Sequence, residues 1–191
     1  KKILAFAAMA VMALGAFAQD MYVGGQVGFW RNSGDNETSF QILPEIGFNL
    51  SEKLAIGTTI GYDYNYNDGR KLNLVVFNPY ARYTFFRNGN VSLFCDGGVD
   101  LGFGKAKYEG ESSDTAVTYG IGIKPGISYS LSDKFSLVAH VGFLGYRGGN
   151  DASGYPDQGG IMLKGNDLSF GFYYISNCNT NNKIGAATMA A

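Results

Sequence analysis

Apolar residues alternate with polar or small residues over several long stretches of the chain. Between residues 40 and 50 each even position is apolar, while the odd positions carry Gln, Leu, Glu, Gly and Asn. A period of two predicts a β-strand whose two faces meet different surroundings. The pattern recurs and predicts eight strands, at 23–29, 40–50, 54–64, 75–85, 91–103, 117–131, 135–145 and 168–174.

The segments that connect these strands alternate between short and long. Tight polar turns are expected at 51–53, 87–90 and 132–134. Longer polar loops are expected at 31–39, 65–71, 105–116 and 147–164. Short turns at one end of a sheet and long loops at the other are typical of a transmembrane β-barrel, with periplasmic turns and extracellular loops.

The apolar faces of the eight strands contain no charged side chain. An Arg or Lys at the bilayer midplane costs about 2–4 kcal/mol, so a lipid-facing surface excludes charge. The opposite faces are small, polar and rich in glycine, which suits the narrow lumen of an eight-stranded barrel. A soluble barrel shows the reverse, with charged residues outside. We therefore predict an all-β fold, an eight-stranded antiparallel up-and-down transmembrane barrel.

Aromatic residues support this interpretation because they gather at both ends of the lipid-facing positions. Near the short turns these are Phe48, Tyr83, Phe85, Tyr129, Phe135, Phe172 and Tyr174. Near the long loops they are Phe29, Tyr62, Tyr64, Phe103, Tyr119 and Phe143. Two such belts are expected at the two membrane interfaces. The alternative is that they form the core of a soluble β-sandwich.

The beginning of the chain has the features of an export signal. Two lysines precede an apolar stretch at 3–17, and Ala16-Phe17-Ala18 matches a signal-peptidase site. The stretch is shorter than the roughly 20 residues of a membrane-spanning helix, which is the alternative interpretation. We expect residues 1–18 to be a cleaved signal peptide, 19–175 to form the barrel and 176–191 to be a polar tail.

The export signal, the eight alternating strands and segments such as 79–83 resemble the small eight-stranded outer-membrane barrels. That group includes the opacity-type adhesins and the families of OmpA's membrane domain and OmpX. The resemblance implies the outer membrane of a Gram-negative-type bacterium and a role in anchoring, adhesion or resistance to host defences. Such barrels usually end on an aromatic residue, whereas the corresponding position here is Ser176.

Composition and charge restrict the partners and cofactors. The chain has 15 basic and 16 acidic residues, a balance that argues against nucleic-acid binding. One histidine and two cysteines argue against an ordinary zinc site. Cys95 falls on the lipid-facing side and Cys178 in the tail, so no disulfide is expected. We expect no cofactor, no metal, outer-membrane lipid as the surroundings, and a monomer.

Seven titratable side chains point into the predicted lumen and form a candidate polar network: Glu45, Asp63, Arg82, Asp96, Asp100, Lys124 and His140. Buried charges require partners. Glu45 and Arg82 are the expected pair, and Arg82 with Asp96 is the alternative. We interpret the network as structural filling of a narrow lumen, and a proton path, an ion path or an active site as the competing interpretation.

The sequence favours a non-enzymatic structural or surface protein whose four loops contact surface or host ligands. A narrow pore is the alternative, because a glycine-rich lumen could be looser than that of other eight-stranded barrels. A lipid-modifying enzyme is the third hypothesis. Any serine–histidine pair would need His140, which is expected inside the lumen and far from the rim.

Overall fold

The computed structural model describes residues 20–177, apart from 35, 109–110 and 164–167. The expected signal peptide and residues 178–191 of the expected tail lie outside this range. No helix among the described residues is long and apolar enough to cross a membrane. The strands are β1 (Asp20–Asn32), β2 (Glu37–Asn49), β3 (Leu54–Asn67), β4 (Arg70–Asn88), β5 (Val91–Tyr108), β6 (Glu111–Ser130), β7 (Phe135–Val141), β8 (Phe143–Gly149), β9 (Gln158–Met162) and β10 (Leu168–Asn177).

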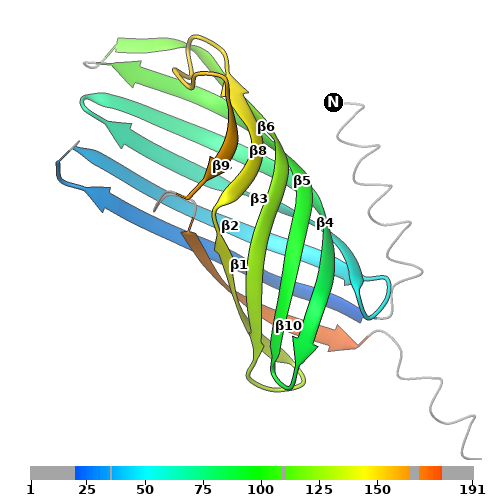
Figure 1. Cartoon of the computed structure of the whole chain (residues 1–191). Helices are drawn as coiled ribbons and strands as arrows, with labels where there is room; N and C mark the ends of the chain where they lie inside the picture. The colour runs from blue at the N-terminus through cyan, green and yellow to red at the C-terminus, as the bar shows by residue number, and fades with distance from the viewer. Residues whose placement is uncertain (1–19, 35, 109–110, 164–167, 178–191) are drawn as a thin grey trace, which may run out of the picture.

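These strands close into one antiparallel barrel (Figure 1). Each of the strands β1 to β6 pairs with the next one in sequence, and β1 also pairs with β10. β7 and β8 together make one strand of the wall, both pairing with β6, and β9 and β10 make the last one. The predicted all-β, eight-stranded, up-and-down barrel is therefore confirmed.

The hairpins at one end of the barrel contain more strand than the sequence suggested. The flanking strands there continue through most of the segments expected as loops, ending at Asn32 and Glu37, at Asn67 and Arg70, and at Tyr108 and Glu111. The fourth segment holds the end of β8, a connection at 150–157 and β9. Backbone pairing does not require hydrophobic alternation, so strands continue where the apolar pattern has already stopped.

The opposite end carries the short connections and both ends of the barrel sequence (Figure 1). The β2–β3, β4–β5 and β6–β7 connections cover 50–53, 89–90 and 131–134, close to the predicted turns. β10 runs two residues beyond the predicted end of the barrel at Ile175, because Ser176 and Asn177 pair with Met21 and Asp20 of β1.

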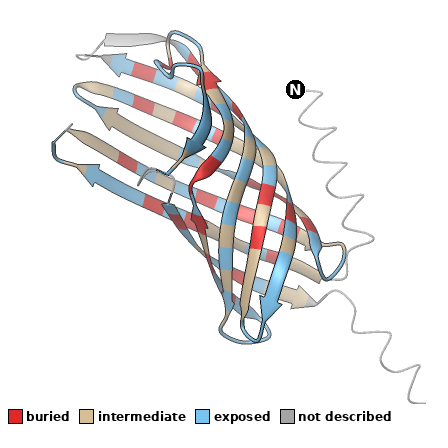
Figure 2. Ribbon diagram, in the orientation of Figure 1, coloured by how far each residue is buried: buried red, intermediate tan, exposed pale blue. Residues whose placement is uncertain are grey.

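Burial alternates along the strands, as Figure 2 shows by its colour bands. The outward side chains are apolar and well exposed, such as Val75 at 60% and Ile121 at 63%. Charged residues that are exposed among the described side chains lie only near the two ends of the barrel: Arg31, Glu52, Lys53, Asp68, Lys71, Arg87, Lys105, Lys107, Asp133, Lys134, Asp151 and Asp157. A charge-free band therefore surrounds the middle of the barrel, as lipid contact requires.

One aromatic residue assigned to the lipid-facing belt proves to face the lumen. Gly142 separates β7 from β8 and has a φ of +73°, a conformation that glycine adopts without strain. The extra residue is a β-bulge, and a shift of one residue exchanges the two faces of the strand beyond it. Phe143 is consequently buried at 2% exposure, whereas Leu144 and Tyr146 face outward. The prediction for Phe143 was therefore wrong.

Three prolines lie on the outer face within strands, where proline is normally disfavoured. Next to each of them the ladder to the following strand is interrupted. No pairing is present opposite Pro44 between β2 and β3, or opposite Pro79 between β4 and β5. Pro125 of β6 lies where the partner changes from β7 to β8. The missing backbone N–H of proline accounts for these local gaps.

Candidate functional site

Arg82 of β4 lies in the half of the lumen nearer the short turns, called here the inner half. Its Nε and Nη2 atoms donate to the two carboxylate oxygens of Asp96, both at 2.7 Å. Asp96 lies directly across the β4–β5 ladder from Arg82. Arg82 Nη2 also lies 3.5 Å from Glu45 Oε1. The structure thus contains both pairings considered from the sequence, with Asp96 as the closer partner.

The two carboxylates around Arg82 have further partners. The Glu45 side chain is fully buried and accepts hydrogen bonds from Gln26 Nε2 at 2.6 Å, from the Tyr173 hydroxyl at 2.7 Å and from the Tyr80 hydroxyl. The other carboxylate, at Asp96, lies 2.7 Å from His140 Nε2. Buried ionic groups are tolerated when hydrogen bonds satisfy them in this way.

Four aromatic rings surround the guanidinium of Arg82. Its Cζ atom lies 4.1 Å from the centroid of Phe94, 5.2 Å from Tyr80, 5.3 Å from Tyr173 and 5.6 Å from Tyr22. All four distances are within the range of cation–π attraction. We call the four rings together with Arg82, Glu45, Asp96 and His140 the plug.

Each ring of the plug lies directly across a strand ladder from a glycine. The pairs are Tyr22–Gly47, Tyr80–Gly57, Phe94–Gly126 and Tyr173–Gly24. At every one of these glycines an added Cβ atom would collide with the ring of its partner. The missing side chains therefore leave the space into which the rings fold, and the rings close the inner half.

None of these four rings belongs to the network of seven side chains predicted from the sequence. Tyr22, Phe94 and Tyr173 occupy lumen-facing positions, whereas aromatic residues were assigned from the sequence only to belts on the outer face. A large aromatic residue opposite a glycine in the strand register is the signal that would have found them. That signal needs the cross-strand register, which the spacing of apolar residues alone does not provide.

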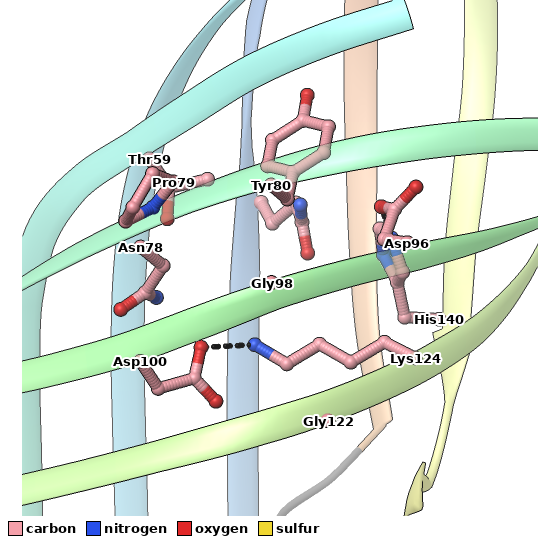
Figure 3. Close-up of a pocket in the computed structure, with 11 residues that line it drawn as sticks. Thr59, Asn78, Pro79, Tyr80, Asp96, Gly98, Asp100, Gly122, Lys124 and His140 are labelled. Atoms are coloured by element: carbon pink, nitrogen blue, oxygen red, sulfur yellow. Dashed lines mark hydrogen bonds and ion pairs between the residues drawn. The ribbon is translucent and has the colours of Figure 1, made fainter. Parts of the chain in front are cut away.

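A small cavity of about 40 Å³ borders the plug (Figure 3). Three buried polar atoms at its wall have no hydrogen-bond partner: Thr59 Oγ1, Asn78 Oδ1 and His140 Nδ1. A polar cavity of this size suits bound water, which commonly satisfies such groups. Lys124 and Asp100 also line this cavity, and Lys124 Nζ lies 2.6 Å from Asp100 Oδ1, the contact drawn as a dashed line in Figure 3.

The outer half of the lumen, nearer the long hairpins, contains a much larger cavity of about 560 Å³. Asp100 and Lys124 lie at this cavity, and Arg147 Nη2 is 3.8 Å from Asp100 Oδ2. Asp63 also lines the cavity, with Asn65 Nδ2 donating to it at 2.7 Å. The seven residues named from the sequence are therefore divided, with four in the plug, Asp100 paired with Lys124, and Asp63 apart.

Arg147 is a cavity residue that the sequence did not reveal. It was assigned to a loop, whereas the bulge at Gly142 turns it into the lumen from β8. There its Cζ atom lies 3.7 Å from the ring centroid of Phe143, the other residue that the bulge turns inward.

Part of the outer half is apolar, which the sequence pattern also did not suggest. A buried cluster on the lumen side joins Leu43, Leu72, Leu74, Val76, Ala106 and Ala116. Leu43, Leu74 and Val76 of this cluster line the large cavity. The cavity therefore has one apolar wall, from β2 and β4, while neutral polar, aromatic and charged groups line most of the rest.

Among the described residues there is no group of three or more His, Cys, Asp or Glu side chains that could hold a metal ion. His140 has Asp96 as its hydrogen-bond partner, and no described serine or cysteine is bonded to its ring. An acid–histidine pair without a nucleophile lacks the group that would attack a substrate. Cys95 is a free thiol, and Cys178 lies outside the described residues.

The barrel architecture, the charge-free outer band and the polar lumen define an integral outer-membrane barrel protein. Residues 3–175 match the family model described as "Outer membrane protein beta-barrel domain". The chain belongs to this family.

Several solved structures share the fold at low sequence identity. The N-terminal barrel domain of Pseudomonas aeruginosa OprF is 11% identical, with a TM-score of 0.55, and the match covers 83% of this chain and 98% of that one. Neisserial surface protein A is 18% identical, with a TM-score of 0.53 and coverage of 81% and 95%. A major outer membrane protein from Thermus thermophilus is 15% identical, with a TM-score of 0.51 and coverage of 82% and 98%. No curated protein sequence matches the chain.

Proposed function

We propose that this protein is a non-enzymatic outer-membrane barrel with a closed lumen, which presents a rim of β-hairpins at the cell surface for contact with surface or host ligands. The observation that carries the proposal is the plug. Its Arg82, Glu45 and Asp96 side chains are each at most 10% exposed, and the four rings pack around them.

The same observation argues against the pore hypothesis. Eight strands enclose a lumen just wide enough for side chains to fill. Glycine had suggested a looser lumen, but at four lumen-facing positions the space that glycine leaves is taken by a ring from the neighbouring strand. An ion crossing the barrel would have to displace paired and desolvated charges, which is costly.

Support for a surface role comes from the rim. The β3–β4 hairpin extends to Asp68 and Gly69, and the strands of the β1–β2 hairpin extend to Asn32 and Glu37, at the same end of the barrel. The rim also carries exposed Arg31, Lys71 and Lys105. The enzyme hypothesis receives no comparable support, because His140 is buried at 4% exposure inside the plug.

Two experiments test the two parts of the proposal. In planar bilayers the purified protein should give no steady stepwise conductance, while a general porin added afterwards to the same membrane should conduct and show that channels are detectable. Reproducible steps from this protein would overturn the closed-lumen part.

For the surface role, cysteine should be placed at Asp68 in the rim and, as the matched control, at Asp133 in a short turn, with Cys95 and Cys178 changed to Ser. In intact cells a membrane-impermeant maleimide should label the first variant and not the second. Labelling of the second alone would reverse the orientation and overturn the surface role of the hairpins.

A further inference from the structure

We propose that the large cavity in the outer half of the lumen binds a small amphipathic molecule that carries a protonated amine. Asp63 is the partner of the amine, and the wall formed by Leu43, Leu74 and Val76 receives the apolar part. This site lies outside the plug and is independent of whether the barrel conducts.

The size and position of the cavity suit a small molecule. Its volume of about 560 Å³ lies within the range of about 300–1,000 Å³ that is usual for ligand pockets. Trp30, Asn32 and Tyr155 line it from the hairpin end of the barrel, and Asn78 and Lys124 line it next to the plug. A ligand would therefore enter from the side of the long hairpins, since the plug closes the other side.

Asp63 is an acidic residue of the cavity without an ion pair of its own, because Arg147 attracts it only from beyond 4.0 Å and lies 3.8 Å from Asp100. Its carboxylate accepts a hydrogen bond from Asn65, and no described Lys, Arg or His nitrogen lies within 4.0 Å of it. A half-buried carboxylate beside apolar groups gains when a cation approaches it. An ammonium group has three N–H donors and would form charge-assisted hydrogen bonds with this carboxylate.

The apolar wall begins directly beside Asp63. Leu74 is its cross-strand partner in the β3–β4 ladder, and Val76 follows on the same face of β4. Leu43 lies on β2, the other neighbour of β3, and belongs to the same buried cluster. A ligand needs only a short distance between its charged and apolar parts to reach both, which defines a compact arylalkyl or alkyl amine.

The basic residues of the cavity do not favour an anionic ligand. Lys124 Nζ lies 2.6 Å from Asp100 Oδ1, and Arg147 Nη2 lies 3.8 Å from Asp100 Oδ2. Both cations are therefore already paired with this carboxylate. Among the described lining residues the basic side chains are Lys124 and Arg147, and both lie against Asp100. An anionic ligand would therefore have to displace Asp100 from these cations, whereas a cation can approach Asp63 without breaking an ion pair.

The protein contains its own reporter for this site. Trp30 is the only tryptophan in the chain and lines the cavity. Its fluorescence should be followed in detergent micelles while phenethylamine is added at neutral pH, where the amine is protonated. The matched probe is 2-phenylethanol, which has the same ring and two-carbon chain without the charge. Phenethylamine should give a saturable change, and 2-phenylethanol should bind at least about tenfold more weakly.

Asp63→Asn should weaken phenethylamine binding by about tenfold or more and leave 2-phenylethanol unchanged, because it removes the charge and keeps the shape. The matched control is Asp133→Asn in an exposed turn, which should bind as the unmodified protein does. Heat modifiability on gels should show that both variants are folded. Equal affinity for the two probes, undiminished phenethylamine binding by Asp63→Asn, or no saturable change would overturn the proposal. None of these outcomes depends on the conductance measurement.

Discussion

The inner and outer halves of the lumen are built on the same strands and the same alternation of residues, yet one half is filled and the other is hollow. In the inner half large rings lie opposite glycines, as with Tyr80 and Gly57, and a shared cation lies among them. In the outer half medium-sized aliphatic residues cover one wall, while Asp100 and Lys124 bond to each other across neighbouring strands instead of reaching across the lumen.

This contrast shows that two different properties of the sequence control a narrow barrel. A period of two decides which side chains enter the lumen. The sizes of side chains paired across the ladders decide whether the lumen is filled. Charges have different consequences in the two halves, because Arg82 holds its neighbours together whereas Asp63 forms no ion pair and is attracted only by the more distant Arg147.

Among the substitutions that test this difference between the two halves, Asp96→Asn in the plug should have the largest effect on stability. This change takes the closest counter-ion from Arg82 and an anionic partner from His140. Leaving one member of a buried ion pair without its partner costs about 3–5 kcal/mol, and we expect a loss of that size in the free energy of unfolding. Urea unfolding in lipid vesicles measures it, and a loss below about 1 kcal/mol would show that the plug does not hold the inner half together.

A second change tests the wall that both halves share. Ile123 faces outward on β6, roughly midway between Tyr119 and Tyr129 of the two aromatic belts, and is 44% exposed. Ile123→Arg should destabilise the barrel by about 2–4 kcal/mol in bilayers, since it places a charge near the midplane. Ser132→Arg in the exposed β6–β7 connection is the control and should change little. Equal losses at the two sites would contradict the assignment of the lipid-facing side.

The fold and the faces of most strands could be predicted, because lipid imposes a simple rule on each outward position. The prediction failed for Phe143 because a single bulge at Gly142 exchanges the two faces of the strand beyond it. Alternation of apolar residues does not reveal such an inserted residue. Arg147 was missed because it was assigned to the last long loop, whereas it lies on β8 and, beyond the bulge, faces the lumen. The hairpins were taken as loops because their strands lie beyond the bilayer and carry no apolar alternation.

The candidate site could be predicted only in part. The lumen-facing charges were found from their positions on the strands, but their partners depend on the stagger of neighbouring strands, which sets the height of each residue in the barrel. Arg82 meets Asp96 through direct cross-strand register, and Asp63 lies too far toward the hairpins to join them. The division of the lumen into two halves therefore required the structure.

A third, smaller effect separates ring packing from charge. Gly57→Ala places a Cβ atom against the ring and hydroxyl of Tyr80, which packs within the plug. Overpacking of this kind typically costs about 1–3 kcal/mol. The matched control is Gly97→Ala, because a Cβ atom there meets nothing within 4 Å. If both variants unfold at the same urea concentration, the rings do not depend on the space that the glycines leave.

The smallest expected effect comes from the same type of substitution, Asp to Asn, made in the outer half of the lumen. Asp63→Asn removes a carboxylate that forms no ion pair, and its one hydrogen-bond partner, Asn65, finds an equivalent oxygen in the new side chain. The free energy of unfolding should therefore stay within about 0.5 kcal/mol of the original value, or rise slightly because a poorly compensated charge is gone. Urea unfolding beside Asp96→Asn under identical conditions is the measurement. A loss comparable to that of Asp96→Asn would mean that Asp63 also serves the stability of the barrel, and its carboxylate would then not be available to a ligand.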